Sequence, residues 1–173
     1  VNLKFKVKDM DIWFDMYDSV PQTYMAQTFT IIAPEHPKVL ELVKGTKYEK
    51  KVMEFVEKIK KKKLTGKFDI ETDMEGIFTG KYIEYTAANK DLPIWIASFV
   101  VADYGSGIVN CSAHDERDFV FAKKYDLLIV TSGDVIFAGV VILKEANDPE
   151  YRKYGTGTFI MFEQIRKCIE SGL

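Results

Sequence analysis

The fold of this chain is decided by two neighbouring stretches, GIFTGKYIEY at residues 76–85 and LPIWIASFVV at residues 92–101. Both stretches are rich in β-branched and aromatic residues, which favour extended strands. Asn89, Lys90 and Asp91 lie between them and are typical of a turn. The sequence therefore predicts two strands here, joined by that turn.

Further strands are expected on both sides of this pair. Residues 3–7 alternate between apolar residues and lysines, which is the period of a half-buried strand. We expect residues 11–14 to pair with them across a turn near residues 8–9. Residues 28–33 predict a buried strand, and an apolar run at residues 108–109 predicts another.

Helices are indicated by a different spacing. Apolar residues between 48 and 63 recur at offsets of 0, 4, 7, 8 and 11, which is typical of a helix with one apolar face. Gly66 is expected to end this helix. The residues of that face are Tyr48, Val52, Phe55, Val56 and Ile59.

Shorter helices are expected elsewhere. His36 and Pro37 precede a short helix, since proline is tolerated in a first turn, and its apolar residues are Val39, Leu40 and Val43. A second short helix is predicted over residues 115–124. The remaining expectations are strands at 127–130 and 135–143, and a closing helix that carries Phe162, Ile165 and Ile169.

The alternation of strands and helices is too irregular for a doubly wound parallel sheet. We therefore expect a single α+β domain over residues 1–173, with a compact β-barrel-like core of mixed or antiparallel strands and several peripheral helices. The chain starts at Val1 without a methionine, and we expect a piece excised from a larger protein.

The composition restricts the class of protein. There are 24 basic and 26 acidic residues, so the net charge of −2 does not indicate an extensive nucleic-acid-binding surface. Two distant cysteines, Cys111 and Cys168, and two histidines argue against a zinc site and fit a reducing cytosol. No apolar run approaches the roughly 18 residues of a membrane span. We expect a cytoplasmic protein with no metal, no cofactor and no membrane contact.

One basic cluster does occur, at residues 60–63. Two interpretations remain open for it. The lysines are either a solvated helix end, favoured by the helix dipole, or a contact for phosphate groups.

The densest polar constellation is His114-Asp115-Glu116-Arg117-Asp118, where a buried strand gives way to a helix. Asp115 and Asp118 have the spacing of a helix cap and its third residue, so both acids could simply stabilise the helix. Alternatively, Asp118 faces a groove and pairs with an ammonium group, with Arg117 steadying it or meeting a phosphate. His114 is either a structural residue or a general base.

A second polar stretch, residues 18–23, precedes the strand at residues 28–33. It is either an ordinary loop or a source of hydroxyl contacts for a small polar ligand. Gly105 and Gly107 do not complete a phosphate-binding motif. The chain also lacks a GxSxG motif, so the sequence does not support a covalent hydrolase.

Four motifs occur in an order that resembles the inserted editing domain, connective peptide 1, of bacterial-type leucyl-tRNA synthetases. They are Ala33-Pro34-Glu35-His36-Pro37, then Gly76-Ile77-Phe78-Thr79-Gly80-Lys81-Tyr82, then Leu92-Pro93-Ile94-Trp95-Ile96-Ala97 leading to Asp103-Tyr104-Gly105-Ser106-Gly107, then His114-Asp115-Glu116-Arg117-Asp118-Phe119. The resemblance covers most of residues 1–130 and implies the synthetase editing-domain fold.

The resemblance also implies an activity. Members of this family hydrolyse the ester between a noncognate amino acid and the terminal adenosine of tRNA(Leu), as part of leucine–tRNA ligase. Editing is needed because a synthetic pocket separates aliphatic side chains that differ by one methylene by only about 1–3 kcal/mol. The expected function is post-transfer deacylation of tRNA(Leu) carrying an isoleucine-like or norvaline-like residue. The expected partners are that tRNA 3′ end and the rest of the synthetase.

Site residues follow from the motifs. Asp118 matches the aspartate that binds the substrate α-ammonium, and Asp115 matches a second acid of the same motif. Thr23 matches a threonine thought to exclude leucine sterically. The resemblance implies attack by a positioned water, without a protein nucleophile or a metal. Substrate-binding roles are expected for Ser19, Thr28, Arg117 and His114.

The chain departs from the family in two places. The family peptide Thr-Thr-Arg-Pro-Asp-Thr is here Asp18-Ser19-Val20-Pro21-Gln22-Thr23, so the arginine and the aspartate are replaced. Residues 110–113 are also one residue shorter than the usual segment. The alternative hypothesis is therefore a catalytically degenerate insert that binds the tRNA 3′ end or spaces domains without hydrolysis.

Overall fold

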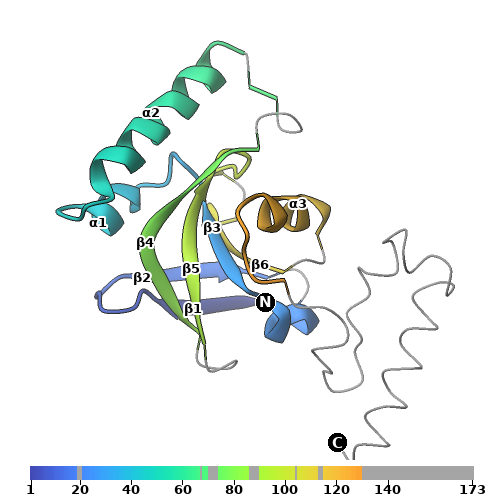
Figure 1. Ribbon diagram of the computed structural model, residues 1–173. Coiled ribbons are helices and arrows are strands. Elements are labelled where there is room, and N and C mark those ends of the chain that lie inside the picture. The colour runs from blue at the N-terminus through green and yellow to red at the C-terminus, as the bar shows by residue number, and fades with distance from the viewer. Residues whose placement is uncertain are drawn as a thin grey trace, which may run out of the picture. The chain divides into compact units, whose positions relative to one another are not determined.

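A four-stranded mixed sheet forms the centre of the first of two compact units of the chain (Figure 1). The computed structural model describes residues 1–18, 21–66, 68–69, 74–85, 90–103, 105–112 and 115–129. The first unit comprises Val1–Ser19 with Phe29–Asn110, and the second comprises Val20–Thr28 with Cys111–Leu173.

The described residues form strands, α-helices and one 3-10 helix. In chain order the elements are β1 (Asn2–Lys6), β2 (Trp13–Tyr17), η1 (Pro21–Ala26), β3 (Phe29–Ile32), α1 (Val39–Val43), α2 (Glu49–Leu64), β4 (Gly76–Tyr85), β5 (Lys90–Ala97), β6 (Ile108–Cys111) and α3 (Glu116–Lys124). None of the helices in this part of the chain is long and apolar enough to cross a membrane.

The central sheet has the strand order β4-β5-β3-β6. β4 and β5 are antiparallel, whereas β3 and β5 are parallel. A buried hydrogen bond joins β3 to β6, in which the Thr30 hydroxyl donates to Asn110 Oδ1 at 2.6 Å. The expected α+β class with a mixed sheet is thus confirmed.

A separate antiparallel hairpin, β1 and β2, confirms the expected pairing of the first two strands, although the second strand is Trp13–Tyr17 and not residues 11–14. It joins the larger sheet through a bridge between Val7 and Ile83, where the Lys8 N–H donates to the Tyr82 carbonyl at 2.9 Å. Within the described strands this arrangement remains open, so the expectation of a barrel-like core was wrong. Among the described residues, the hairpin and the larger sheet are joined at this bridge. The strands do not form a closed ring of hydrogen-bonded neighbours, as a barrel requires.

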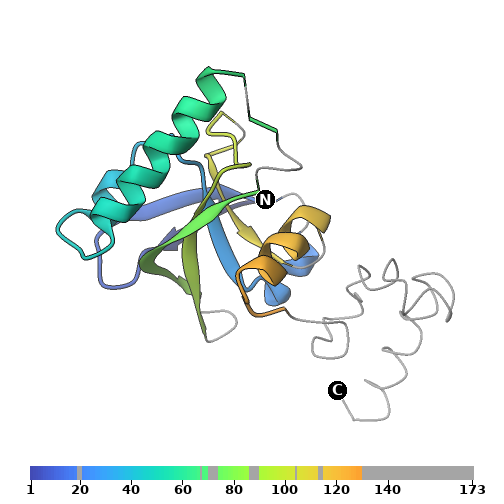
Figure 2. The same cartoon turned by 45° about the horizontal axis from the view of Figure 1, so that its top comes forward.

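The core of the first unit lies on one face of the β4–β5 pair. Ile83, Leu92, Ile94 and Ile96 alternate along these strands, and each is fully buried. Helices α1 and α2 both contact β4. Figures 1 and 2 show α2 beside β4, at one end of the sheet. The alternation along these strands therefore separates a buried face from an outer one.

Helix α2 confirms the predicted helix over residues 48–63. Its buried positions, Val52, Val56 and Ile59, follow the expected spacing. The helix ends as predicted just before Gly66, whose φ of +64° is a left-handed conformation that favours glycine. In α1, by contrast, Leu40 is 46% exposed and does not contribute to the core as expected.

The lysines at the end of α2 are partly used in ion pairs. Glu75, which directly precedes β4, accepts a hydrogen bond from Lys58 and lies 3.2 Å from Lys62 Nζ. The hydrogen bond from Lys58 lowers the pKa of Glu75 below its ordinary value, although burial opposes the change. Lys63 Nζ lies 2.9 Å from Glu35 Oε1. These pairs tie the helix end to two neighbouring segments and support a structural role for this end of the lysine run.

Some predicted boundaries were wrong. Lys90 and Asp91 are not turn residues but the first residues of β5, since they pair with Tyr85 and Glu84 of β4. The second strand of the pair also ends earlier, at Ala97 instead of residue 101. Residues 127–129 are not a strand. The strand expected at 135–143 and the helix expected around Phe162, Ile165 and Ile169 lie outside the described residues.

Strand β4 contains a bulge that depends on a glycine. Phe78 pairs with Trp95 and Tyr82 pairs with Pro93, so residues 79–81 lie opposite the single residue Ile94. The Thr79 hydroxyl donates to the Ile94 carbonyl at 2.8 Å and completes the bulge. Gly80 has a φ of +76°, and a Cβ added there would overlap the ring of Tyr48.

We expect Gly80→Ala to destabilise the domain more than Gly66→Ala does. Both glycines have positive φ, which costs an L-residue about 1–2 kcal/mol. Gly66 has open space around its Cβ position, whereas Gly80 adds an overpacking cost of about 1–3 kcal/mol against Tyr48. Urea unfolding of both variants measures the difference. Equal losses of stability would mean that the Tyr48 ring moves away without cost.

Candidate functional site

Three of the predicted site residues, Asp115, Arg117 and Asp118, lie at the first turn of α3, in the second unit. Asp115 is the N-cap of this helix and has an extended backbone conformation. Its Oδ1 accepts hydrogen bonds from the N–H of Arg117 at 2.8 Å and of Asp118 at 3.4 Å. These bonds satisfy amides that have no partner within the helix. The capping role predicted for Asp115 is confirmed.

Arg117 lies close to the capping acid. Its Nε is 3.9 Å from Asp115 Oδ1, with the two side chains 59% and 55% exposed. An exposed pair at this distance contributes roughly 0–1 kcal/mol. The guanidinium therefore remains accessible to a further anionic group.

Asp118 is the third residue of α3 and is half-buried. Its main-chain N–H donates to the cap, while the carboxylate that receives the capping bonds belongs to Asp115. Glu116 and Asp118 also place two acids in the first turn of the helix. With Asp115, three carboxylates and one guanidinium gather at this helix end and outweigh the partial positive charge of the helix dipole. The local charge therefore favours a cation.

The second segment of the site belongs to the same compact unit. Thr23 lies within η1, and the 3-10 helix is followed directly by Gln27 and Thr28. The Thr28 N–H donates to the Cys111 carbonyl at 2.8 Å, which links this segment to the chain that leads into α3. Thr23 is half-buried, while Thr28 is only 5% exposed.

The side chain of Thr28 has an unusual environment. Its Oγ1 is buried and has no hydrogen-bond partner among the described residues. Leaving a buried hydroxyl unpaired costs about 1–3 kcal/mol, and such groups often mark a place where a ligand or an ordered water completes the structure. The hydroxyl is therefore a candidate contact for a polar ligand.

The structure thus places Thr23, Thr28, Asp115, Arg117 and Asp118 in one compact unit. Two other candidates, Ser19 and His114, lie outside the described residues. In the portion of the chain that the structure describes, no group of three or more His, Cys, Asp or Glu side chains could hold a metal ion.

Sequence reasoning did not single out Ser112 as a site candidate. It directly follows β6, is only 8% exposed, and lies in the segment that carries the chain toward α3. Its polarity was visible in the sequence, but its burial was not, because a serine beside a strand end is ordinarily exposed. Ser112 becomes a candidate site residue because it is buried next to the hydrogen bond between Thr28 and Cys111.

Comparison with known proteins agrees with the resemblance described above. A sequence model of the family described as "Leucyl-tRNA synthetase, editing domain" matches residues 1–156. Leucine–tRNA ligases from Nitratidesulfovibrio vulgaris strain DP4 and Oleidesulfovibrio alaskensis are each 40% identical over 126 residues, which is 72% of this chain. The chain spans 15% of the length of these relatives.

Among solved structures, the chain resembles Agrobacterium radiobacter K84 agnB2 LeuRS in a ternary complex with tRNA and LeuAMS. The TM-score is 0.66 at 23% sequence identity, and the match covers 81% of this chain and 17% of the other. This similarity supports the fold. Together with the match of the family model to most of the sequence, it leads to one conclusion: the chain belongs to the leucyl-tRNA synthetase editing-domain family.

Proposed function

We propose that this domain is a post-transfer editing hydrolase, which removes noncognate amino acids from mischarged tRNA(Leu). The observation that carries the proposal is the division of roles in the first turn of α3. Asp115 receives the capping hydrogen bonds, and Asp118 contributes a second carboxylate one turn into the helix. An aspartate carries a negative charge at neutral pH, so Asp118 is suited to bind the α-ammonium group of an aminoacyl ester.

The charge balance of the site supports this assignment. A helix N-terminus ordinarily favours anions, which would suit a phosphate more than an ammonium group. Here Asp115, Glu116 and Asp118 reverse that preference, since within the described part of this turn three acids stand against the single cation Arg117. A substrate that presents a cation to this turn fits better than a phosphate alone.

The hydroxyl groups of the site supply the second part of the proposal. Thr23 would line the space for the substrate side chain and exclude leucine, and Thr28 would offer its unpaired hydroxyl to the ester or to the terminal ribose. A threonine presents both a methyl and a hydroxyl group, so it can limit size and donate a hydrogen bond at the same position.

The reaction is an ester hydrolysis that needs no covalent intermediate. Water adds to the carbonyl carbon, the bond from that carbon to the ribose oxygen breaks, and the ribose oxygen takes a proton. The products are a free amino acid and uncharged tRNA. The protein would contribute by holding the ester in one orientation and by its fixed charges. No metal or cofactor takes part in the proposed step.

The partners follow from the wider family. The relatives are leucine–tRNA ligases that are much longer than this chain, and the structural neighbour was solved with tRNA. We infer that the partners are the 3′ end of mischarged tRNA(Leu) and the remainder of a synthetase, in the cytoplasm.

We expect Asp118→Ala to slow deacylation of isoleucyl-tRNA(Leu) on the order of 100-fold, because loss of the ammonium contact releases the ester from its reactive orientation. Single-turnover hydrolysis by the purified domain measures this. Glu116→Gln is the matched control, since it removes one exposed charge from the same turn without removing the ammonium contact, and it should slow the reaction far less than Asp118→Ala does. Equal rates for Asp118→Ala and the unchanged protein would remove Asp118 from the mechanism. Binding of the acceptor end without any hydrolysis would instead favour a degenerate insert.

Asp115 is expected to act by positioning the helix that carries Asp118. Asp115→Ala should lower the free energy of unfolding by about 1 kcal/mol through loss of the cap and should slow deacylation. Asp115→Asn retains an acceptor oxygen, so it should restore both properties. Thermal unfolding and deacylation are measured on the same preparations. An Asn variant that is stable yet as slow as the Ala variant would show that the charge of Asp115 acts on the substrate directly.

Thr23→Ala is expected to enlarge the site and allow cleavage of leucyl-tRNA(Leu). Removing the side chain creates room for a methylene-sized difference, which is worth about 1–3 kcal/mol in a hydrophobic pocket. Release of leucine from correctly charged tRNA is the readout, and Thr23→Val is the control because it preserves the shape without the hydroxyl. Continued rejection of leucine by Thr23→Ala would mean that another residue guards the site.

A further inference from the structure

Four aromatic side chains form a cluster on the outer face of β4 and β5, away from the buried aliphatic face. Phe78 is at its centre, with ring centroids 5.8 Å from Tyr48, 5.5 Å from Tyr82 and 5.6 Å from Trp95. The contacts with the two tyrosines are edge-to-face, and the contact with the tryptophan is tilted. We call these four residues the aromatic platform.

The platform continues across the bulge in β4. Paired residues on antiparallel strands share a face, so the pairs Phe78–Trp95 and Tyr82–Pro93 both point outward. The bulge adds two residues to β4 relative to β5, an even number, so Phe78 and Tyr82 lie on the same face on either side of it. The glycine within the bulge also leaves room for Tyr48 to lie against the strand.

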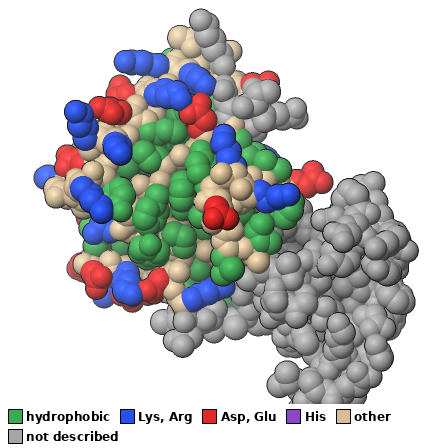
Figure 3. Space-filling model, in the orientation of Figure 1, with side chains coloured by type: hydrophobic (Ala, Val, Ile, Leu, Met, Phe, Trp, Pro, Cys, Tyr) green, Lys and Arg blue, Asp and Glu red, His purple; other side chains and the backbone are tan. Residues whose placement is uncertain are grey.

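The platform is accessible. Tyr82 is 40% exposed, and the other three rings are half-buried. In Figure 3 hydrophobic side chains gather over the position of β4 and β5 in Figure 1, with basic and acidic side chains around them. An exposed apolar patch with a charged rim is typical of an interaction site.

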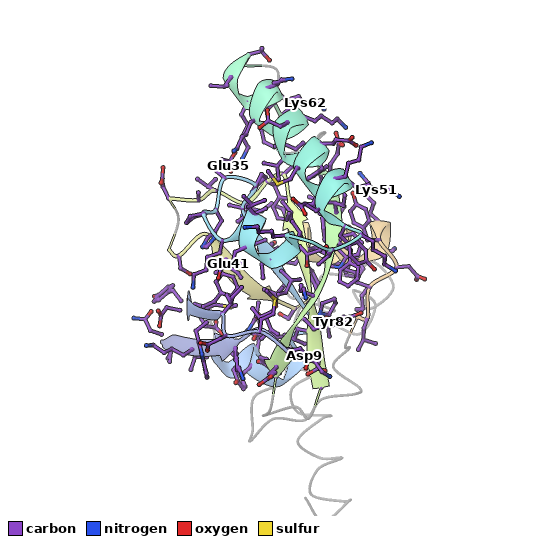
Figure 4. The ribbon with its side chains drawn as sticks, turned by 90° about the vertical axis from the view of Figure 1, so that its left-hand side faces the viewer. Asp9, Glu35, Glu41, Lys51, Lys62 and Tyr82 are labelled. Atoms are coloured by element: carbon purple, nitrogen blue, oxygen red, sulfur yellow. The ribbon has the colours of Figure 1, made fainter. Side chains whose placement is uncertain are left out.

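The charges around the platform differ between its two ends. At the helix end, Lys47 Nζ lies 5.2 Å from the centre of the Tyr48 ring, and the exposed Lys51 follows one helical turn later. Figure 4 shows Lys51 and Tyr82 on the same side of the molecule. At the far end, Glu84 and Asp91 form a cross-strand pair, and Lys8 pairs with Asp91.

We propose that the aromatic platform binds single-stranded RNA, with unpaired bases stacked on the rings and the phosphates directed toward Lys47 and Lys51. Every base has a π face, so stacking requires no particular sequence. The rings are held by contacts with one another, which reduces the ordering needed when a base arrives. The lysines at one end and the acids at the other give the strand a preferred path across the sheet.

A peptide segment fits the platform less well than RNA does. Proline-rich peptides also dock on aromatic rings, but the nearest charges at the helix end, Lys47 and Lys51, are cations that match the phosphates of a nucleic acid. The inference rests on the proposed function, because mischarged tRNA would supply the unpaired nucleotides.

The test uses the tryptophan of the platform as its own probe. The chain contains two tryptophans, so Trp13→Phe leaves Trp95 as the single reporter. This protein is titrated with a single-stranded oligoadenylate of about 12 nucleotides, within the site sizes known for stacking proteins. We expect saturable quenching of Trp95 fluorescence that weakens as salt increases. RNA duplex of the same length should not compete.

Two variants and one control decide the outcome. Tyr82→Ala should weaken binding on the order of 10-fold, the loss expected for one stacked base. The double change Lys47→Ala and Lys51→Ala should reduce the salt dependence, with little effect on the fold because both side chains are exposed. Tyr17→Ala is the matched control, since Tyr17 is 53% exposed on β2 and is not part of the platform.

Equal affinity of the Tyr82 and Tyr17 variants for RNA would overturn the inference. So would an absence of quenching combined with platform-dependent self-association in sedimentation, which would indicate a protein interface. Deacylation is measured on the same proteins to separate the two proposals. RNA binding that persists in a domain without deacylation overturns the proposed function alone, whereas deacylation that persists without RNA binding at the platform overturns this inference alone.

Discussion

The pairing of β4 with β5 is the constraint on which the rest of the first unit depends. A strand has two faces, and its register decides which side chains enter the core. Here the register buries Ile83 and Leu92 and directs Phe78 and Trp95 outward. Strand β3 then pairs with β5, and β6 with β3. A shift by one residue along β4 would therefore expose the core of the whole sheet.

The bulge is what allows this pairing to serve two purposes. It takes up three residues of β4 opposite a single residue of β5, and because the insertion is even, the aliphatic and aromatic side chains stay on separate faces along the whole strand. Gly80 supplies the positive φ that the bulge needs, and the Thr79 hydroxyl supplies its missing hydrogen bond. In the motif GIFTGKY, Thr79 and Gly80 thus form the bulge, and the aromatic residues Phe78 and Tyr82 on either side of it face outward.

The first turn of α3, in the second unit, combines a helix cap with a cluster of acidic residues. One carboxylate, from Asp115, accepts hydrogen bonds from the amides of Arg117 and Asp118 in the first turn. The three acids of this turn together change the sign of the local charge. Helix termini are usually anion sites, and it is the sequence of this turn, not the geometry of the helix, that makes a cationic ligand the better fit.

The sequence alone determined most of the strands and helices up to α3, the aliphatic face of α2 and the cap at Asp115, because each depends on side chains close together in the chain. It also carried the family, through motifs that occur in order. Tertiary structure decided what depends on distant residues. The sheet is open where a barrel was expected, Leu40 is exposed, and Lys90 and Asp91 extend a strand, because pairing with β4 outweighs their preference for a turn. Similarly, the unpaired hydroxyl of Thr28 and the gathering of Tyr48 with Phe78, Tyr82 and Trp95 arise from burial and packing between segments, which no local pattern encodes.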